Sequence, residues 1–175
     1  MCGIFGIVGQ NYNNAADIRR LSSHAKRRGR DSSGIMMFQD ETYFVEKADF
    51  DISKLVSNVK IKHPSLFFGI GRLITNDNEA NQPYYSNDIF VFHNGIIVND
   101  NEVFNKEKMN RTTNLDTEVL HALVKKYYKG MKLENFKKIF LSKCIGTISL
   151  AIALPRLGKL ILFSNHGSLY LGYKS

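Results

Sequence analysis

Tryptophan is absent from the 175-residue chain, and only two cysteines and three prolines are present. Two cysteines cannot build a structural zinc site by themselves, and a disulfide is not expected in a reducing compartment. No proline-rich linker, internal repeat or low-complexity segment divides the chain. The longest apolar stretch, residues 145–154, is interrupted by polar residues and is too short to span a bilayer. These absences argue against a zinc module, a multidomain array and a membrane span.

The length is that of one well-buried domain, so residues 1–175 are interpreted as a single domain. No charged segment followed by an apolar segment precedes position 2, so we expect no signal peptide and a cytoplasmic protein. The formal net charge is +8. A basic surface can attract nucleic acid. The lysines are spread along amphipathic stretches, however, and no nucleic-acid-binding motif accompanies them, so nucleic acid is not an expected partner.

Hydrophobic periodicity and turn residues predict alternating strands and helices. The predicted strands are residues 4–8, 34–38, 42–48, 66–74, 89–92, 145–154, 159–163 and 169–173. The first predicted helix begins at a cap formed by Asn13 or Asn14 and ends near Gly29. Three further helices are predicted over residues 52–59, 119–128 and 133–140. Residues 76–83 are predicted to form a loop, and Asn94-Gly95 is typical of a turn. Strands, a helical pair and further strands favour an α+β fold.

Cys2 is the most informative residue in the chain. If Met1 is removed, Cys2 carries both a thiol and a free α-amine. The amine has a pKa near 7.7–8.0, so it can accept a proton near neutral pH and activate its own thiol as a nucleophile. The alternative is a small buried residue at the start of a strand, since free cysteine is often buried and inert.

Six segments occur in a characteristic order: residues 1–4 (MCGI), 28–34 (RGRDSSG), 69–75 (GIGRLIT), 93–99 (HNGIIVN), 115–119 (LDTEV) and 167–172 (GSLYLG). Together they resemble the class II glutamine amidotransferase domain, a member of the N-terminal-nucleophile hydrolases. The segment around Arg72 is a diverged form of the family block, in which His-Thr usually precedes the arginine. The resemblance extends over the whole chain.

The resemblance implies a role for each matching residue. Cys2 would be the nucleophile, and Asn94 and Gly95 would hold the oxyanion through a side-chain N–H and a backbone N–H. Arg72 would bind the α-carboxylate of free glutamine, and Asp116 would bind its α-ammonium. Thr75 would be a further substrate-binding residue. The supporting residues are expected to be Arg28 and Asp31, acting through buried polar contacts. His93 is not required by this scheme.

Each position also has an ordinary interpretation. Asn94-Gly95 can be a hairpin turn, Arg72 a surface arginine, and Asp116 the N-cap of the helix that follows it. Asp116 can also serve both roles at once. The ordered coincidence of these residues with Cys2 favours the catalytic interpretation.

The resemblance implies an αββα sandwich of two antiparallel sheets with outer helices, shortened at its C-terminus relative to the usual family domain. It also implies hydrolysis of the L-glutamine side-chain amide, with no metal and no organic cofactor. The ammonia would pass to a synthase subunit or domain. Two alternatives remain open: an N-terminal-nucleophile amidohydrolase for another amide, and a non-catalytic regulatory or interaction module on the same fold.

Overall fold

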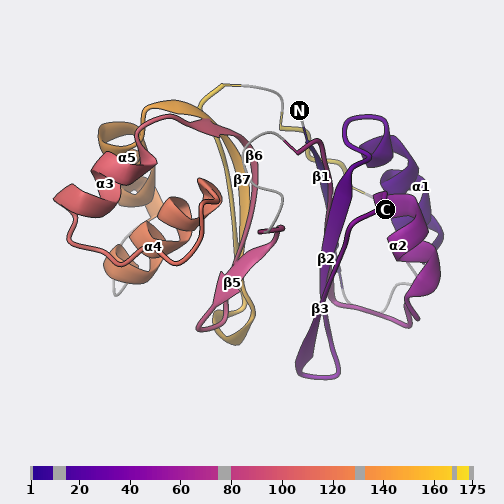
Figure 1. The fold of residues 1–175 in the computed structure, drawn as a ribbon. Coiled ribbons are helices and arrows are strands. Elements are labelled where there is room, and N and C mark those ends of the chain that lie inside the picture. Colours follow the sequence, from indigo (N-terminus) through magenta and orange to yellow (C-terminus); the bar gives the residue numbers. More distant parts are fainter. Residues whose placement is uncertain (1, 10–14, 75–79, 129–132, 167–168, 174–175) are drawn as a thin grey trace.

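The computed structural model describes residues 2–9, 15–74, 80–128, 133–166 and 169–173 (Figure 1). The strands are β1 (Gly3–Val8), β2 (Ser32–Gln39), β3 (Thr42–Ala48), β4 (Leu66–Arg72), β5 (Tyr84–Ser86), β6 (Ile89–Ile97), β7 (Gly146–Leu154) and β8 (Lys159–Ser164). The helices are α1 (Ala15–Lys26), α2 (Ile52–Asn58), α3 (Asp100–Lys106), α4 (Thr117–Tyr127) and α5 (Leu133–Lys143), with a short 3₁₀ turn at Pro155–Leu157.

The strands form two four-stranded antiparallel sheets. The first sheet has the order β1-β4-β2-β3 and the second has the order β5-β6-β7-β8. Figure 1 shows the two sheets face to face, with α1 and α2 outside the first sheet and α3, α4 and α5 outside the second. The expected αββα sandwich is therefore confirmed.

Three apolar clusters hold the four layers together. One cluster lies between the first sheet and helices α1 and α2, and another joins the second sheet to α3, α4 and α5. The third lies between the sheets and includes Met36, Phe68 and Phe92. Phe68 and Phe92 come from opposite sheets, and their ring centroids are 5.8 Å apart. The two sheets therefore meet through side chains rather than through backbone hydrogen bonds.

Strand β2 shows why its residues belong in a middle layer. All six residues from Ser32 to Met37 are buried, because helices cover one face and the second sheet covers the other. Ile35 and Met37 join the cluster beneath the helices, whereas Met36 joins the cluster between the sheets. This alternation follows from the two-residue period of a strand.

Most predicted elements are present, with four differences. Residues 89–97 form one continuous strand, so the turn predicted at Asn94-Gly95 is wrong. The strand predicted over residues 169–173 is also wrong, because these residues form no strand and Tyr173 is 94% exposed. Helix α3 and the three-residue strand β5 were not predicted. The predicted caps Asn13 and Asn14 lie outside the described residues.

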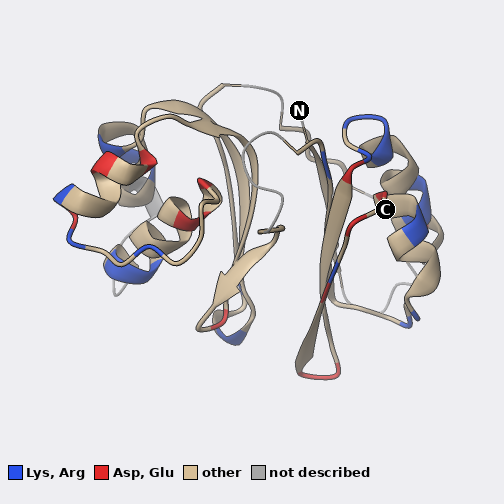
Figure 2. Cartoon of the chain, viewed as in Figure 1, with Lys and Arg blue, Asp and Glu red and all other residues tan. Residues whose placement is uncertain are grey.

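The basic residues are distributed over both helical layers, as Figure 2 shows. Among the described residues, no helix has the length and hydrophobicity needed to cross a membrane.

Candidate active site

Cys2 lies immediately before β1 and packs against the apolar cluster between the sheets. The antiparallel register pairs Gly3 with Gly71, which places Cys2 beside the end of β4 and hence beside Arg72. A Cβ atom on Gly3 would lie only 2.7 Å from the carbonyl oxygen of Ala25. Glycine at position 3 therefore lets the start of β1 pack closely against α1, and this contact fixes the position of the residue before it.

A hydrogen bond joins Cys2 to Asn94 across the two sheets. The Cys2 nitrogen donates to Asn94 Oδ1 at 3.0 Å. Because Oδ1 faces this donor, the Nδ2 end of the same amide is turned away from the Cys2 nitrogen. On the other side, Arg28 Nε donates to the Cys2 carbonyl oxygen at 3.1 Å. The backbone of Cys2 is thus held from both sides.

Gly95 continues strand β6 and does not make a turn. It pairs with Ile148 of β7, and a Cβ atom at position 95 would lie 1.9 Å from the carbonyl oxygen of Thr147. The same atom would lie 2.7 Å from His93 Nε2. Glycine is therefore required here for close approach between neighbouring strands rather than for chain reversal.

Arg72 is the last residue of β4 and is only 5% exposed, so it is not a surface arginine. Its Nη1 atom donates to the carbonyl oxygen of Ala80 at 2.8 Å and to Asn81 Oδ1 at 3.2 Å. These acceptors fix the orientation of the planar guanidinium. A buried guanidinium in a fixed orientation is suited to pairing with a carboxylate.

The segment containing Arg28 and Asp31 supports the end of β4. Asp31 Oδ2 accepts a hydrogen bond from the Ile74 nitrogen at 2.9 Å, and the Asp31 nitrogen donates to the Arg72 carbonyl oxygen at 2.9 Å. A Cβ atom on Gly29 would lie 2.3 Å from the Arg72 carbonyl carbon. Both Arg28 and Asp31 are exposed, so the expectation of buried contacts is wrong, and the support comes from surface hydrogen bonds.

Asp116 occupies the N-cap position of α4, as interpreted from the sequence, but its side chain makes no capping hydrogen bond. Instead, Asp116 Oδ2 accepts a hydrogen bond from the Ile97 nitrogen at 3.0 Å, and Oδ1 lies 3.8 Å from His93 Nδ1. Burial raises the pKa of Asp116, but the hydrogen bond and charge of His93 and the Ile97 N–H outweigh burial and lower it overall. The carboxylate is therefore ionised at neutral pH.

His93 is buried beside Asp116, although we assigned it no role from the sequence. Its Nε2 atom lies 3.2 Å from the Thr147 carbonyl oxygen, and its Nδ1 atom lies 3.4 Å from Thr117 Oγ1. The ring therefore connects the start of α4 with β7, directly beside Asn94. Asn81 was also missed: it lies in a predicted loop, and only the fold reveals its contact with Arg72.

The structure thus brings Cys2 to Asn94 and beside Arg72 at one end of the space between the sheets. Asp116 contacts Ile97 and His93 of β6, the strand that carries Asn94, and Ile97 packs in the cluster between the second sheet and its helices. Thr75, the remaining predicted substrate-binding residue, lies outside the described residues. Among the residues that the structure describes, no group of three or more histidine, cysteine or acidic side chains could hold a metal ion.

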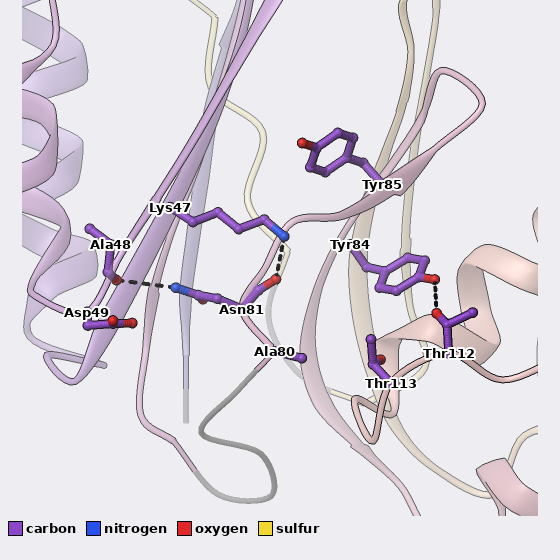
Figure 3. A pocket seen from close by; sticks show the side chains of 9 residues that line it. All are labelled: Lys47, Ala48, Asp49, Ala80, Asn81, Tyr84, Tyr85, Thr112 and Thr113. Carbon is purple, nitrogen blue, oxygen red and sulfur yellow. Dashed lines mark hydrogen bonds between the residues drawn. The ribbon is translucent and has the colours of Figure 1, made fainter.

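A cavity of about 590 Å³ lies farther along the space between the sheets (Figure 3). Its lining residues are Lys47, Ala48, Asp49, Ala80, Asn81, Tyr84, Tyr85, Thr112 and Thr113. Cys2, Asn94 and Asp116 do not line this cavity, so it is not the place where Cys2 would react. Among the described residues, Ala80 and Asn81, the acceptors of Arg72, connect this cavity with the predicted site.

Comparison with known proteins identifies the family. Residues 71–175 match the glutamine amidotransferase domain. Glutamine–fructose-6-phosphate aminotransferase (isomerizing) of Fusobacterium nucleatum is 31% identical over 98% of this chain and 30% of its own length. The 7-cyano-7-deazaguanine synthase of Saccharolobus solfataricus is 30% identical over 99% of this chain and 40% of its own length. The chain therefore belongs to the class II glutamine amidotransferase domain family, as its motifs predicted.

A solved structure supports the fold. Glutamine phosphoribosylpyrophosphate amidotransferase from B. subtilis, in complex with ADP and GMP, superimposes with a TM-score of 0.66 and 24% sequence identity. The match covers 89% of this chain and 35% of that chain. The chain spans 30% and 40% of the length of the two curated relatives described above.

Proposed function

We propose that this chain hydrolyses the side-chain amide of L-glutamine to glutamate and ammonia, with Cys2 as the nucleophile. The observation that carries the proposal is the 3.0 Å hydrogen bond between the Cys2 nitrogen and Asn94 Oδ1. These residues are 92 positions apart and belong to different sheets. Their meeting places a thiol, a prospective α-amine and a side-chain amide together.

Removal of Met1 would convert the Cys2 nitrogen into the catalytic base. The α-amine takes the thiol proton, and Cys2 Sγ attacks the carbonyl carbon of the glutamine side chain. The carbonyl oxygen becomes an oxyanion, for which Asn94 Nδ2 and the Gly95 N–H are the proposed donors. The carbon–nitrogen bond then breaks, and the proton passes to the departing nitrogen, which leaves as ammonia. Water hydrolyses the remaining thioester, releasing glutamate and restoring the thiol.

Two buried charged residues would recognise the free amino acid. Arg72 would pair with the α-carboxylate, and Asp116, whose lowered pKa keeps it ionised, would pair with the α-ammonium. A substrate lacking one of these groups would leave a buried charge without its partner, which costs binding free energy. The site would therefore favour glutamine over simple amides.

The ammonia would pass to a synthase domain or subunit. This part of the proposal is supported by family membership and by the relatives, which carry the names of aminotransferases and synthases and of whose own length the match covers 30% and 40%. The nature of the ammonia acceptor does not enter the hydrolytic mechanism itself.

The test is ammonia release from glutamine by Cys2→Ala, with Cys144→Ala as the matched control. Cys144 is buried, and burial raises the pKa of its thiol to about 12, so it is not a nucleophile at neutral pH. We expect the Cys2 variant to be inactive and the Cys144 variant to remain active. Intact mass should show that Met1 is absent from the active protein. Ammonia release by Cys2→Ala at the wild-type rate would refute the proposal.

A further inference from the structure

Gln82 makes two hydrogen bonds to the backbone of the residue that precedes Asn94. Its side chain is buried, and its Oε1 atom accepts from the His93 nitrogen at 2.6 Å. Its Nε2 atom donates to the His93 carbonyl oxygen at 3.0 Å. Because the backbone offers one donor and one acceptor, only this orientation of the amide satisfies both.

The side chain of Gln82 continues a sheet in which the backbone strand has stopped. Strand β5 pairs Tyr84 with Val91, and the same register carried two residues further would set position 82 opposite His93. Pro83 lies between them and has no N–H to donate. On its other side, His93 pairs with Leu150 of β7. The amide of Gln82 thus takes the place of a strand at the position directly before Asn94.

The backbone of Gln82 is anchored to the opposite sheet. A Cβ atom on Gly34 of β2 would lie 1.8 Å from the Gln82 carbonyl oxygen, so the two backbones are in close contact. The Gln82 nitrogen donates to Asn81 Oδ1 at 2.8 Å. Asn81 Nδ2 in turn donates to the carbonyl oxygens of Ser33 and Ala48 at 3.0 and 3.2 Å. Gln82 therefore connects the first sheet to the second.

We propose that Gln82 is a positioning residue, which holds β6 so that the amide of Asn94 meets Cys2. This inference rests on the proposed glutaminase function. Cys2 and Asn94 lie on sheets that share no backbone ladder, so their separation depends on contacts such as this one. Asn81 also accepts from Arg72, so the Asn81–Gln82 pair contacts the proposed carboxylate-binding residue as well. Gln82 itself would not touch the substrate.

The first variant is Gln82→Met, which keeps the length of the side chain and removes both hydrogen bonds. A displacement of about 1 Å in a catalytic group can cost about 100-fold in rate. We expect kcat to fall by about 10- to 100-fold. KM should change much less, because Gln82 acts on the oxyanion donor rather than on the bound substrate.

The second variant, Gln82→Glu, gives a signature that a general loss of packing would not. A protonated glutamic acid has one donor and one acceptor and can make both hydrogen bonds to His93. An ionised carboxylate would instead face the His93 carbonyl oxygen, and its burial favours the protonated form. The ratio of variant to wild-type kcat should therefore rise as the pH falls. The same ratio for Gln82→Met should stay flat. Gln39→Glu makes the same chemical change at the far end of β2 and is the control.

Hydrogen exchange at the His93 amide tests, independently of catalysis, whether Gln82 holds the backbone of β6. The amide should exchange at least about tenfold faster in Gln82→Met than in the wild type, because it loses its acceptor. If the wild-type protein releases no ammonia, the glutaminase proposal is refuted. Faster exchange of the His93 amide in Gln82→Met would still support the hydrogen-bonded contact between Gln82 and β6. Unchanged exchange at His93, or a Gln82→Met kcat within about twofold of the wild type, would overturn the positioning role. If Gln82→Met does not fold, a flat pH ratio for Gln82→Glu would overturn it equally.

Discussion

Substitution of Gly95 by alanine tests how closely β6 and β7 approach at the site. The added Cβ atom would lie 1.9 Å from the Thr147 carbonyl oxygen, whereas ordinary contact begins near 3.4 Å. The two strands must therefore separate locally by about 1.5 Å, or β6 must twist. Either movement displaces Asn94, whose Oδ1 is bonded to the Cys2 nitrogen.

The expected cost has a stability part and a catalytic part. Overpacking of this kind costs about 1–3 kcal/mol of unfolding free energy, which for a chain of this length lowers Tm by roughly 3–10 °C. Displacement of Asn94, the proposed oxyanion donor, by about 1 Å is expected to lower kcat by about 100-fold. Stability should therefore fall modestly while ammonia release falls severely.

The assay combines a thermal melt with kcat for ammonia release from glutamine, measured well below Tm. Gly9→Ala is the matched control, because a Cβ atom at position 9 meets nothing within 4 Å and lies at the opposite end of β1 from Cys2. We expect Gly9→Ala to leave both quantities nearly unchanged. A Gly95→Ala protein with wild-type Tm and kcat would show that the strands are not as close as described.

Three further predictions follow from the site and its surroundings. Asn94→Ala should lower kcat by about 10²–10³-fold with a smaller change in KM, as expected for an oxyanion donor. Asp116→Asn should raise KM for glutamine. It should also reduce the ratio of kcat/KM for glutamine to kcat/KM for an analogue without the α-amine, which competition kinetics would measure. Glu107 accepts from Lys126 and Lys143, and these contacts lower its pKa to about 2. Glu107→Gln should therefore cost about 1–2 kcal/mol at pH 7 after allowance for solvent screening, as measured by denaturant unfolding.

The sign of the last effect gives it a pH signature. A carboxylate whose pKa is lower in the folded protein contributes its stability above the ordinary value of 4.5, and loses it as the pH falls towards about 2. The difference in unfolding free energy between the wild type and Glu107→Gln should shrink across that pH window, and a difference that stays constant would contradict the ion-pair account.

The other two predictions also have contrary outcomes. A raised KM with unchanged kcat in Asn94→Ala would show that Asn94 only orients the substrate. Unchanged discrimination in Asp116→Asn would remove its proposed ammonium contact.

Periodicity predicted most of the fold because most elements bury one regular face. Helix α4 is an example, since its apolar residues return at helical spacing and are buried against the second sheet. Helix α3 was missed because it is seven residues long and buries only Val103 and Phe104. Residues 169–173 have the composition of a strand, but they pair with no strand in the part of the chain that the structure describes. Strand propensity alone does not supply a hydrogen-bonding partner.

The motifs indicated the residues of the candidate site, but they did not indicate the contacts that these residues make in the structure. Asn-Gly indicates a turn when only the local sequence is considered. In the structure, glycine is needed at position 95 because Thr147, which is 52 positions away in the chain, packs closely against it. Asp116 has the position and chemistry of an N-cap, yet its carboxylate binds the Ile97 nitrogen. Gln82 carries no local sign of burial, because nothing near it in the sequence shows that His93 will be its partner. The contacts of all three residues are with partners that the local sequence does not indicate.

The arrangement of the two sheets also explains why the candidate site depends on long-range contacts. A site between two sheets has no continuous hydrogen-bonded ladder to set its width, so the width depends on inter-sheet packing and on side-chain bridges. Phe68 and Phe92 pack against each other within the core, while the Cys2–Asn94 hydrogen bond and the side chain of Gln82 link the two sheets at the candidate site. Small changes in these contacts should alter the position of Asn94 relative to Cys2 before they disrupt either sheet. Catalysis is therefore expected to be more sensitive than folding to substitutions in the contacts between the two sheets.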